Sequence, residues 1–225
     1  MPINHILLKK YYLDNKEQYI HRRKSGDIKL WDESYKWDIF PEINEKFKKI
    51  EDVNAENITE IIETLVKNNP SQGSFAHWID MDDLKLLMAK PNGYQIISKV
   101  WHKSPEYVDK YIDTANYMAE FMLNKKFSPS TFGYILAAQD CGTYAIYLDK
   151  LIRKVARLND VEKPGTLSQG AKYKLLNESA NYIGELMQME KEDYQDFPWH
   201  TALNGQDFIY VNMQYPALEL VGDDV

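Results

Sequence analysis

Apolar side chains recur along most of this chain at the three- and four-residue spacing that places them on one face of an α-helix. The clearest stripe consists of Ile58, Ile61, Ile62, Leu65 and Val66. Comparable stripes occupy residues 43–50, 75–89, 108–122, 132–138, 148–155 and 173–187. With a mixed stripe over residues 3–24, the pattern predicts an all-α fold of about eight helices.

Serine, proline and glycine divide these segments. Ser104-Pro105 and Ser128-Pro129 have the form of helix starts, because serine caps a first turn and proline fits its first position. Pro41 likewise predicts the start of a helix that runs to about Ile50. We expect one compact helical domain over residues 1–190.

Residues 191–225 have a different pattern. They are acidic and aromatic, they carry no helical stripe, and only residues 208–211 form a short β-prone run. We interpret residues 191–225 as an irregular segment that leads toward a domain outside this sequence.

The net charge of −7 is unevenly distributed. Residues 184–225 hold nine acids and one base, a net charge of −8, which leaves residues 1–183 at +1. A nearly neutral body does not exclude nucleic acid, because local patches decide such binding. No window approaches the roughly 20 apolar residues that span a bilayer. Since the N-terminus also lacks the form of a signal peptide, the sequence predicts a cytoplasmic protein with no membrane partner.

The common catalytic motifs are absent from the sequence. It contains no P-loop, no His-Glu-x-x-His and no Gly-x-Ser-x-Gly, and its five histidines are widely spaced. The single cysteine, Cys141, lies in an apolar context and is expected to be buried. For the group of Asp80, Asp82 and Asp83, the favoured interpretation is that Asp80 or Asp82 caps the start of the helix bearing Leu84, ahead of a cation site. We predict no catalytic residue, no metal site and no cofactor.

Basic clusters and two tryptophans are the candidate DNA contacts. They are Arg22, Arg23 and Lys24; Lys125 and Lys126; Arg153, Lys154 and Arg157; and Trp31 and Trp37. Cations can contact phosphates, but they also occur on solvated helix faces and at helix C-termini, where they favour the dipole. The tryptophans can stack on bases, with packing in the core as the alternative.

Two segments carry a family resemblance. Residues 127–140 with 144–147 contain Ser-Pro, then Ile-Leu-Ala-Ala, then two tyrosines, and residues 202–210 end in Gln-Asp-Phe-Ile-Tyr. In this order they resemble the N-terminal region of McrB-like AAA+ restriction proteins, to which residues 37–41 are also similar. The resemblance implies recognition of target DNA, often modified DNA, while motor and nuclease lie elsewhere. The GTP-binding motor of that family is not in this sequence.

We therefore expect a non-catalytic DNA-recognition domain of a bacterial restriction or antiviral defence system. Its expected partners are DNA, with modified DNA among the targets, and motor or nuclease subunits of the same system. The alternative is a helical protein–protein interaction or oligomerisation module, suggested by the acidic segment and the lack of net positive charge. A metal-dependent nuclease is a third, less favoured class.

Overall fold

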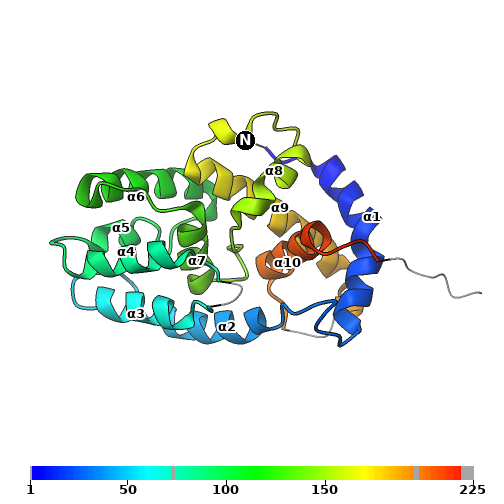
Figure 1. The fold of residues 1–225 in the computed structure, drawn as a ribbon, viewed down its shortest axis with the longest axis horizontal. Coiled ribbons are helices and arrows are strands. Elements are labelled where there is room, and N and C mark those ends of the chain that lie inside the picture. Colours follow the sequence, from blue (N-terminus) through cyan, green and yellow to red (C-terminus); the bar gives the residue numbers. More distant parts are fainter. Residues whose placement is uncertain (1, 72–73, 195–197, 219–225) are drawn as a thin grey trace, which may run out of the picture.

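The computed structural model describes residues 2–71, 74–194 and 198–218, and within them the chain forms ten α-helices and no strand (Figure 1). The all-α prediction is confirmed, and the number of helices is close to the expected eight. The helices are α1 (His5–Lys24), α2 (Tyr35–Phe47), α3 (Ile58–Asn68), α4 (Trp78–Met88), α5 (Tyr94–Ser98), α6 (Val108–Leu123), α7 (Pro129–Gln139), α8 (Asp149–Arg157), α9 (Gln169–Met189) and α10 (Thr201–Gln214). Three short 3-10 helices cover Pro105–Tyr107, Pro164–Thr166 and Lys191–Tyr194.

Serine caps begin both α7, where the sequence predicts it, and α9. The Ser128 hydroxyl accepts from the Thr131 amide at 3.4 Å, and the Ser168 hydroxyl accepts from the Ala171 amide at 3.1 Å. Each bond satisfies one of the backbone donors that a helix leaves without a partner in its first turn.

The start of α2 lies upstream of its predicted position. The helix begins at Tyr35 and contains Pro41 within it. Trp37, Phe40 and Phe47 are all buried, so the apolar face continues upstream of the proline. Tertiary packing of this face outweighs the missing amide donor of Pro41, which ordinarily favours a helix start.

The segment expected to be irregular contains α10, so that part of the prediction is wrong over residues 201–214. Nine residues of α10 are buried, and its β-prone run lies inside the helix. Gly205 permits this packing, because a Cβ added there would lie 1.8 Å from the carbonyl oxygen of Ala180 in α9. Residues 195–197 and 219–225 of the predicted acidic segment lie outside the described residues.

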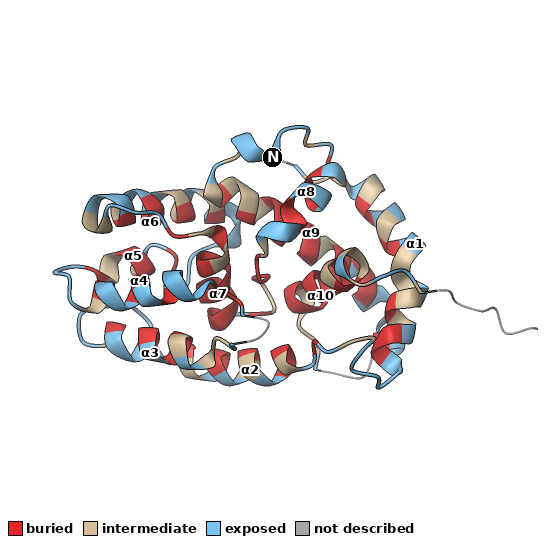
Figure 2. Ribbon diagram, in the orientation of Figure 1, coloured by how far each residue is buried: buried red, intermediate tan, exposed pale blue. Residues whose placement is uncertain are grey.

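The long helix α9 lies at the centre of the fold, where it packs against α10, α6, α1, α8 and α7. Figure 2 shows the resulting distribution, with buried positions of α9 and α10 turned inward and exposed positions on the outer faces of α1, α3 and α6. Helices α1 and α10 also contact each other directly, so the first and last helices of the fold pack together beside α9.

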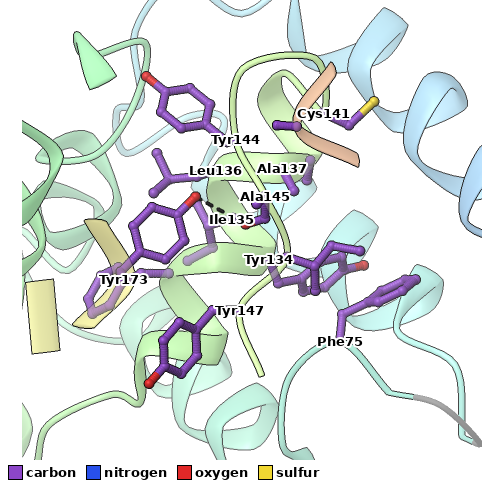
Figure 3. Close-up of a cluster of buried hydrophobic side chains, with 14 of the residues drawn as sticks. Phe75, Tyr134, Ile135, Leu136, Ala137, Cys141, Tyr144, Ala145, Tyr147 and Tyr173 are labelled. Atoms are coloured by element: carbon purple, nitrogen blue, oxygen red, sulfur yellow. Dashed lines mark hydrogen bonds between the residues drawn. The ribbon is translucent and has the colours of Figure 1, made fainter. Parts of the chain in front are cut away.

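A second set of buried side chains surrounds α7. Tyr134, Ile135 and Leu136 of α7 are at most 1% exposed. Figure 3 shows Ile135 and Leu136 beside Tyr173 of α9, whose hydroxyl donates to the carbonyl of Ala145 at 3.1 Å, and Tyr134 beside Phe75. The 127–147 segment that carries the family resemblance thus forms much of this core.

Buried asparagines fix the extended chain that follows α7. The side chain of Asn44 donates to the carbonyls of Ala137 and Ala138 at 2.9 and 2.8 Å and accepts from the Cys141 amide at 3.1 Å. Asn177 accepts from the Ala145 amide at 2.7 Å. These bonds supply partners that backbone groups need when they are buried outside regular structure.

Candidate functional site

A buried polar cluster joins the N-terminal helices to α10. Asp207 of α10 accepts from Lys36 Nζ at 2.9 Å, from the Tyr19 hydroxyl at 2.9 Å and from Trp31 Nε1 at 3.0 Å. Asp207 is 0% exposed. A carboxylate this deeply buried is stable only with such partners, because unpaired charges are expensive inside proteins.

Lys36 is the cationic centre of the cluster. Its ammonium group lies 2.7 Å from Glu33 Oε2, 2.9 Å from Asp207 Oδ1 and 3.3 Å from Gln206 Oε1. The same nitrogen lies 4.9 Å from the centre of the Tyr210 ring, within range of a cation–π contact. All three hydrogens of Lys36 therefore have an acceptor.

The surroundings of the cluster shift the pKa values of its members. Burial alone would lower the pKa of Lys36, but the carboxylates of Asp207 and Glu33 outweigh burial and raise it. Burial raises the pKa of Glu33, and the nearby Lys36 ammonium opposes that shift. The cluster thus stabilises the charged form of Lys36.

Two candidate DNA contacts, Arg22 and Arg23, are buried in this fold at 2% and 4% exposure. Arg22 donates to the carbonyl of Leu30 at 3.3 Å and to that of Pro216, and its guanidinium lies 5.4 Å from the Tyr215 ring centre. Arg23 donates to the Tyr19 hydroxyl at 3.0 Å. Both side chains connect the end of α1 to other parts of the core.

The two candidate tryptophans pack around Arg23. The guanidinium of Arg23 lies 5.0 Å from the ring centre of Trp37 and 5.6 Å from that of Trp31. Trp37 is buried and Trp31 is partly buried, with 5.9 Å between their ring centres. This geometry corresponds to the core-packing alternative for the pair.

The candidate lysines after α6 form ion pairs. Lys125 pairs with Asp83 of α4, and Lys126 lies 3.1 Å from Glu120. They lie far from the cluster at the end of α1, because α6 and α1 occupy opposite ends of the long axis of the molecule (Figure 1). Lys24, the last residue of α1, is exposed. The clusters at the end of α1 and after α6 therefore do not converge on one face.

Helix α8 is the most basic exposed element among the candidates. It holds four bases (Lys150, Arg153, Lys154 and Arg157) and one acid (Asp149), a net charge of 4 − 1 = +3. Arg153 and Arg157 are exposed one turn apart, and neither forms an ion pair within the described chain. Lys154 donates to the Met213 carbonyl of α10 and remains exposed.

Two adjoining hollows lie between the start of α2, the start of α8 and the end of α10. The outer hollow has a volume of about 630 Å³ and the inner chamber one of about 80 Å³. They share four lining residues, Glu33, Tyr35, Lys150 and Tyr210. The inner chamber also reaches Lys36 and Gln206, so the buried cluster forms its polar end.

The remaining candidate chemistry is structural. The predicted cap of α4 by Asp80 or Asp82 is wrong, because His77 caps this helix and both aspartates lie within it. Asp80 instead accepts from the Ser128 amide at 3.1 Å and from the Ser128 and Thr131 hydroxyls, so it supports the start of α7. Cys141 is buried as predicted, and burial raises its pKa to about 12. Among the described residues, no group of three His, Cys, Asp or Glu side chains is placed to hold a metal ion.

Sequence reasoning missed the residues that define this cluster. Lys36 and Glu33 stand in an aromatic segment, and Gln206 and Asp207 stand in a segment expected to be irregular. The available signal was a lone lysine between Tyr35 and Trp37, on a stripe that continues to Phe47.

Among its described residues the chain thus belongs to the all-α class, and a buried ion network joins its N-terminal and C-terminal helices. Comparisons of the chain with known protein families, curated proteins and solved structures found no match. In the described part of the chain, no helix is both long and apolar enough to cross a membrane.

Proposed function

We propose that this chain is a non-catalytic DNA-recognition domain of a restriction or antiviral defence system, and that α8 contacts the DNA backbone. The observation that carries the proposal is the exposed pair of guanidinium groups on Arg153 and Arg157. Arginines without a carboxylate partner can donate to phosphate oxygens, and such contacts supply most non-specific affinity for DNA.

The neighbours of this pair extend the basic surface. Lys150 and Lys154 lie on the same short helix and are exposed. The other basic clusters contribute less to the proposal, because Arg22 and Arg23 are buried and Lys125 and Lys126 are paired. In the proposed system, motor and nuclease functions belong to partner subunits, and modified DNA is among the targets.

The test is fluorescence anisotropy with labelled duplexes, methylated and unmethylated, over a series of salt concentrations. We expect the double variant Arg153→Ala/Arg157→Ala to bind more weakly and to reduce the salt slope by about 2, one for each lost phosphate contact. The loss should be similar for both duplexes, because phosphate contacts carry no sequence information.

The matched control is Lys67→Ala/Lys90→Ala. It removes the same charge from exposed positions, one on α3 and one just after α4. Its affinity and salt slope should equal those of the unmodified protein. Equal weakening in both variants, or no binding by the unmodified protein at high micromolar concentration in low salt, would refute the proposal.

A second candidate function is oligomerisation through the outer face of α6. Tyr117 and Phe121 lie one turn apart on this face and are 73% and 86% exposed. Lys110 and Glu120, of opposite charge, are exposed near the two ends of the same stretch of helix. Antiparallel pairing of two α6 helices would bring each lysine near the glutamate of the other copy, which favours a second copy of this chain as the occupant.

Sedimentation velocity tests the second candidate. We expect concentration-dependent dimerisation that Phe121→Asp abolishes, because the charge would be buried at the contact. Ile6→Asp is the control, since Ile6 of α1 is similarly exposed at 81%. A strict monomer at all concentrations would exclude this function.

A further inference from the structure

A separate pocket lies against α9, between this helix, the 3-10 helix Pro105–Tyr107 and the chain that follows α7. Its volume is about 360 Å³, within the range of roughly 300–1,000 Å³ that is usual for ligand pockets. Four lining residues of α9 share one side of the helix, and Glu106 and Thr143 lie among the residues that close the pocket; the four are Asn177, Glu178, Asn181 and Glu185.

The side chain of Asn177 presents a hydrogen-bond donor to this pocket. The residue lines the pocket and is 3% exposed. Its Oδ1 accepts from the Ala145 amide at 2.7 Å, which fixes the orientation of the side-chain amide, because a backbone N–H needs an oxygen. The Nδ2 of Asn177 donates to no acceptor in the described chain, and it does not belong to the unpaired polar atoms that lack accessible surface. This donor is therefore suited to a carbonyl oxygen of a ligand.

Asn181, one turn further along α9, offers the complementary acceptor. Its Nδ2 donates to the carbonyls of Thr143 at 3.0 Å and Asn177 at 2.9 Å, so its Oδ1 is the atom that has no donor in the described chain. Side chains one helical turn apart have Cβ atoms about 5–6 Å apart. An extended residue directs its own N–H and C=O to the same side, as paired strands do. The two asparagines thus match the polar groups of one extended residue.

All the charged residues that line the pocket are acidic, namely Glu106, Glu178 and Glu185. Glu178 lies 3.8 Å from Lys174, whereas Glu106 and Glu185 form no ion pair with the described residues. In the described chain, no three acidic side chains are placed to hold a metal ion. These carboxylates therefore suit separate cationic groups along an extended occupant.

We propose that this pocket binds an extended basic segment of a partner protein. The carbonyl oxygen of one residue accepts from Asn177 Nδ2, its N–H donates to Asn181 Oδ1, and neighbouring lysine or arginine side chains pair with the glutamates. Main-chain hydrogen bonds supply affinity in such peptide recognition, and complementary charge supplies specificity. The inference does not depend on DNA binding by α8 or on pairing of α6.

The test uses the peptide acetyl-Gly-Lys-Lys-Gly-amide and NMR of the ¹⁵N-labelled full chain. We expect saturable shifts of the side-chain amide signals of Asn177 and Asn181. The signal of Asn44 should not move, because its amide bonds to the backbone inside the core. Putrescine has the same charge but no peptide group, so it should bind at least about tenfold more weakly, as should the peptide methylated on both lysine backbone nitrogens.

Two double variants assign the charge contacts. Glu106→Gln/Glu185→Gln keeps the shape of both exposed side chains and removes two charges at the pocket, so peptide affinity should fall about tenfold at low salt. Glu56→Gln/Glu63→Gln is the matched control, because it removes the same charge from exposed positions just before α3 and within it. This control should keep the affinity within about twofold.

Three results would overturn the inference. One is the lack of any saturable shift up to about 5 mM peptide. A second is equal affinity for the peptide and putrescine, which would exclude recognition of the peptide backbone. The third is equal weakening in both double variants, which would indicate general attraction to an acidic protein. Arg153→Ala/Arg157→Ala should leave peptide binding unchanged, so failure of the DNA proposal and failure of this inference are distinguishable.

Discussion

Lys36 illustrates how one residue holds distant helices together. Its ammonium pairs with Glu33, just before α2, and with Asp207 of α10, which follows Lys36 by 171 positions in the sequence. A buried ion pair contributes little net stability when compared with an apolar pair, but removing one partner leaves an uncompensated charge. The cluster is therefore more sensitive to single substitutions than to coordinated ones.

Replacement of Lys36 by methionine should lower the free energy of unfolding by about 3–5 kcal/mol at pH 7, because two carboxylates remain buried without their cation. The loss should shrink as the pH falls. Lys36 opposes the effect of burial, so without it the pKa of Glu33 rises further. As the pH falls toward the ordinary range of a carboxyl group, Glu33 of the folded variant therefore takes up a proton, and the cost of its buried charge is removed.

Urea unfolding at pH 7 and pH 5 measures this effect. Lys46→Met is the matched control, since Lys46 also belongs to α2 but pairs with Glu60 on the surface, with side chains 42% and 59% exposed. That variant should lose less than about 1 kcal/mol at either pH. A Lys36→Met protein as stable as this control would show that the buried carboxylates are not stabilised by Lys36.

At the scale of helices, close contact between α9 and α10 depends on glycine at the crossing. A Cβ on Gly205 would lie 1.8 Å from the Ala180 carbonyl oxygen, and one on Gly184 would lie 2.1 Å from that of Thr201. Both obstacles are backbone atoms, which cannot rotate away as a flexible side chain would. The two helices must separate if either position gains a side chain.

Gly205→Ala should therefore destabilise the protein by about 3 kcal/mol or more, the upper part of the range for overpacking, despite the better helix propensity of alanine. Gly165→Ala is the control, because a Cβ there meets nothing within 4 Å. Its free energy of unfolding should change by no more than about 0.5 kcal/mol. Thermal and urea unfolding of the two variants measure these changes, and equal stability of both variants would contradict the prediction.

A comparison of α7 and α9 with α10 shows how much of the structure the sequence predicts. Helices with a regular apolar stripe and a serine cap, such as α7 and α9, follow local rules and were predictable. In α10 the buried residues include Asn204, Gln206 and Asp207, whose polarity is typical of loops. The partners of Gln206 and Asp207 lie on α1, on α2 and in the segment between these two helices. Spacing along one chain does not reveal such partners. For the same reason Arg22 and Arg23 resembled surface cations.

At the scale of the whole molecule, buried tyrosines predict sensitivity to alkali. Of the 16 tyrosines, Tyr144 and Tyr194 are at most 5% exposed, and burial raises the pKa of each to about 12. A phenol with a raised pKa in the folded state contributes stability that is complete below about pH 10 and is lost as the pH rises toward 12.

We expect the free energy of unfolding to fall steeply between pH 10 and 12. The fall should be about 1.4 kcal/mol per pH unit for each phenol that is ionised in the unfolded chain but still protonated in the folded protein. The part of the phenolate absorbance that comes from the buried tyrosines should appear together with unfolding and not before it. Tyr144→Phe removes one such group and should reduce the slope accordingly. Full ionisation of the tyrosines in a protein that stays folded would contradict this prediction.

The Lys36–Asp207 bond also has a consequence for synthesis on the ribosome. Residues 33–36 emerge long before residue 207, and their buried partner in the native fold does not yet exist. Contacts this distant in sequence form late and slow the folding of a chain. The N-terminal helices must therefore remain without their final packing until α10 leaves the exit tunnel, so this protein completes its core after translation of that helix and exposes apolar surface to chaperones until then.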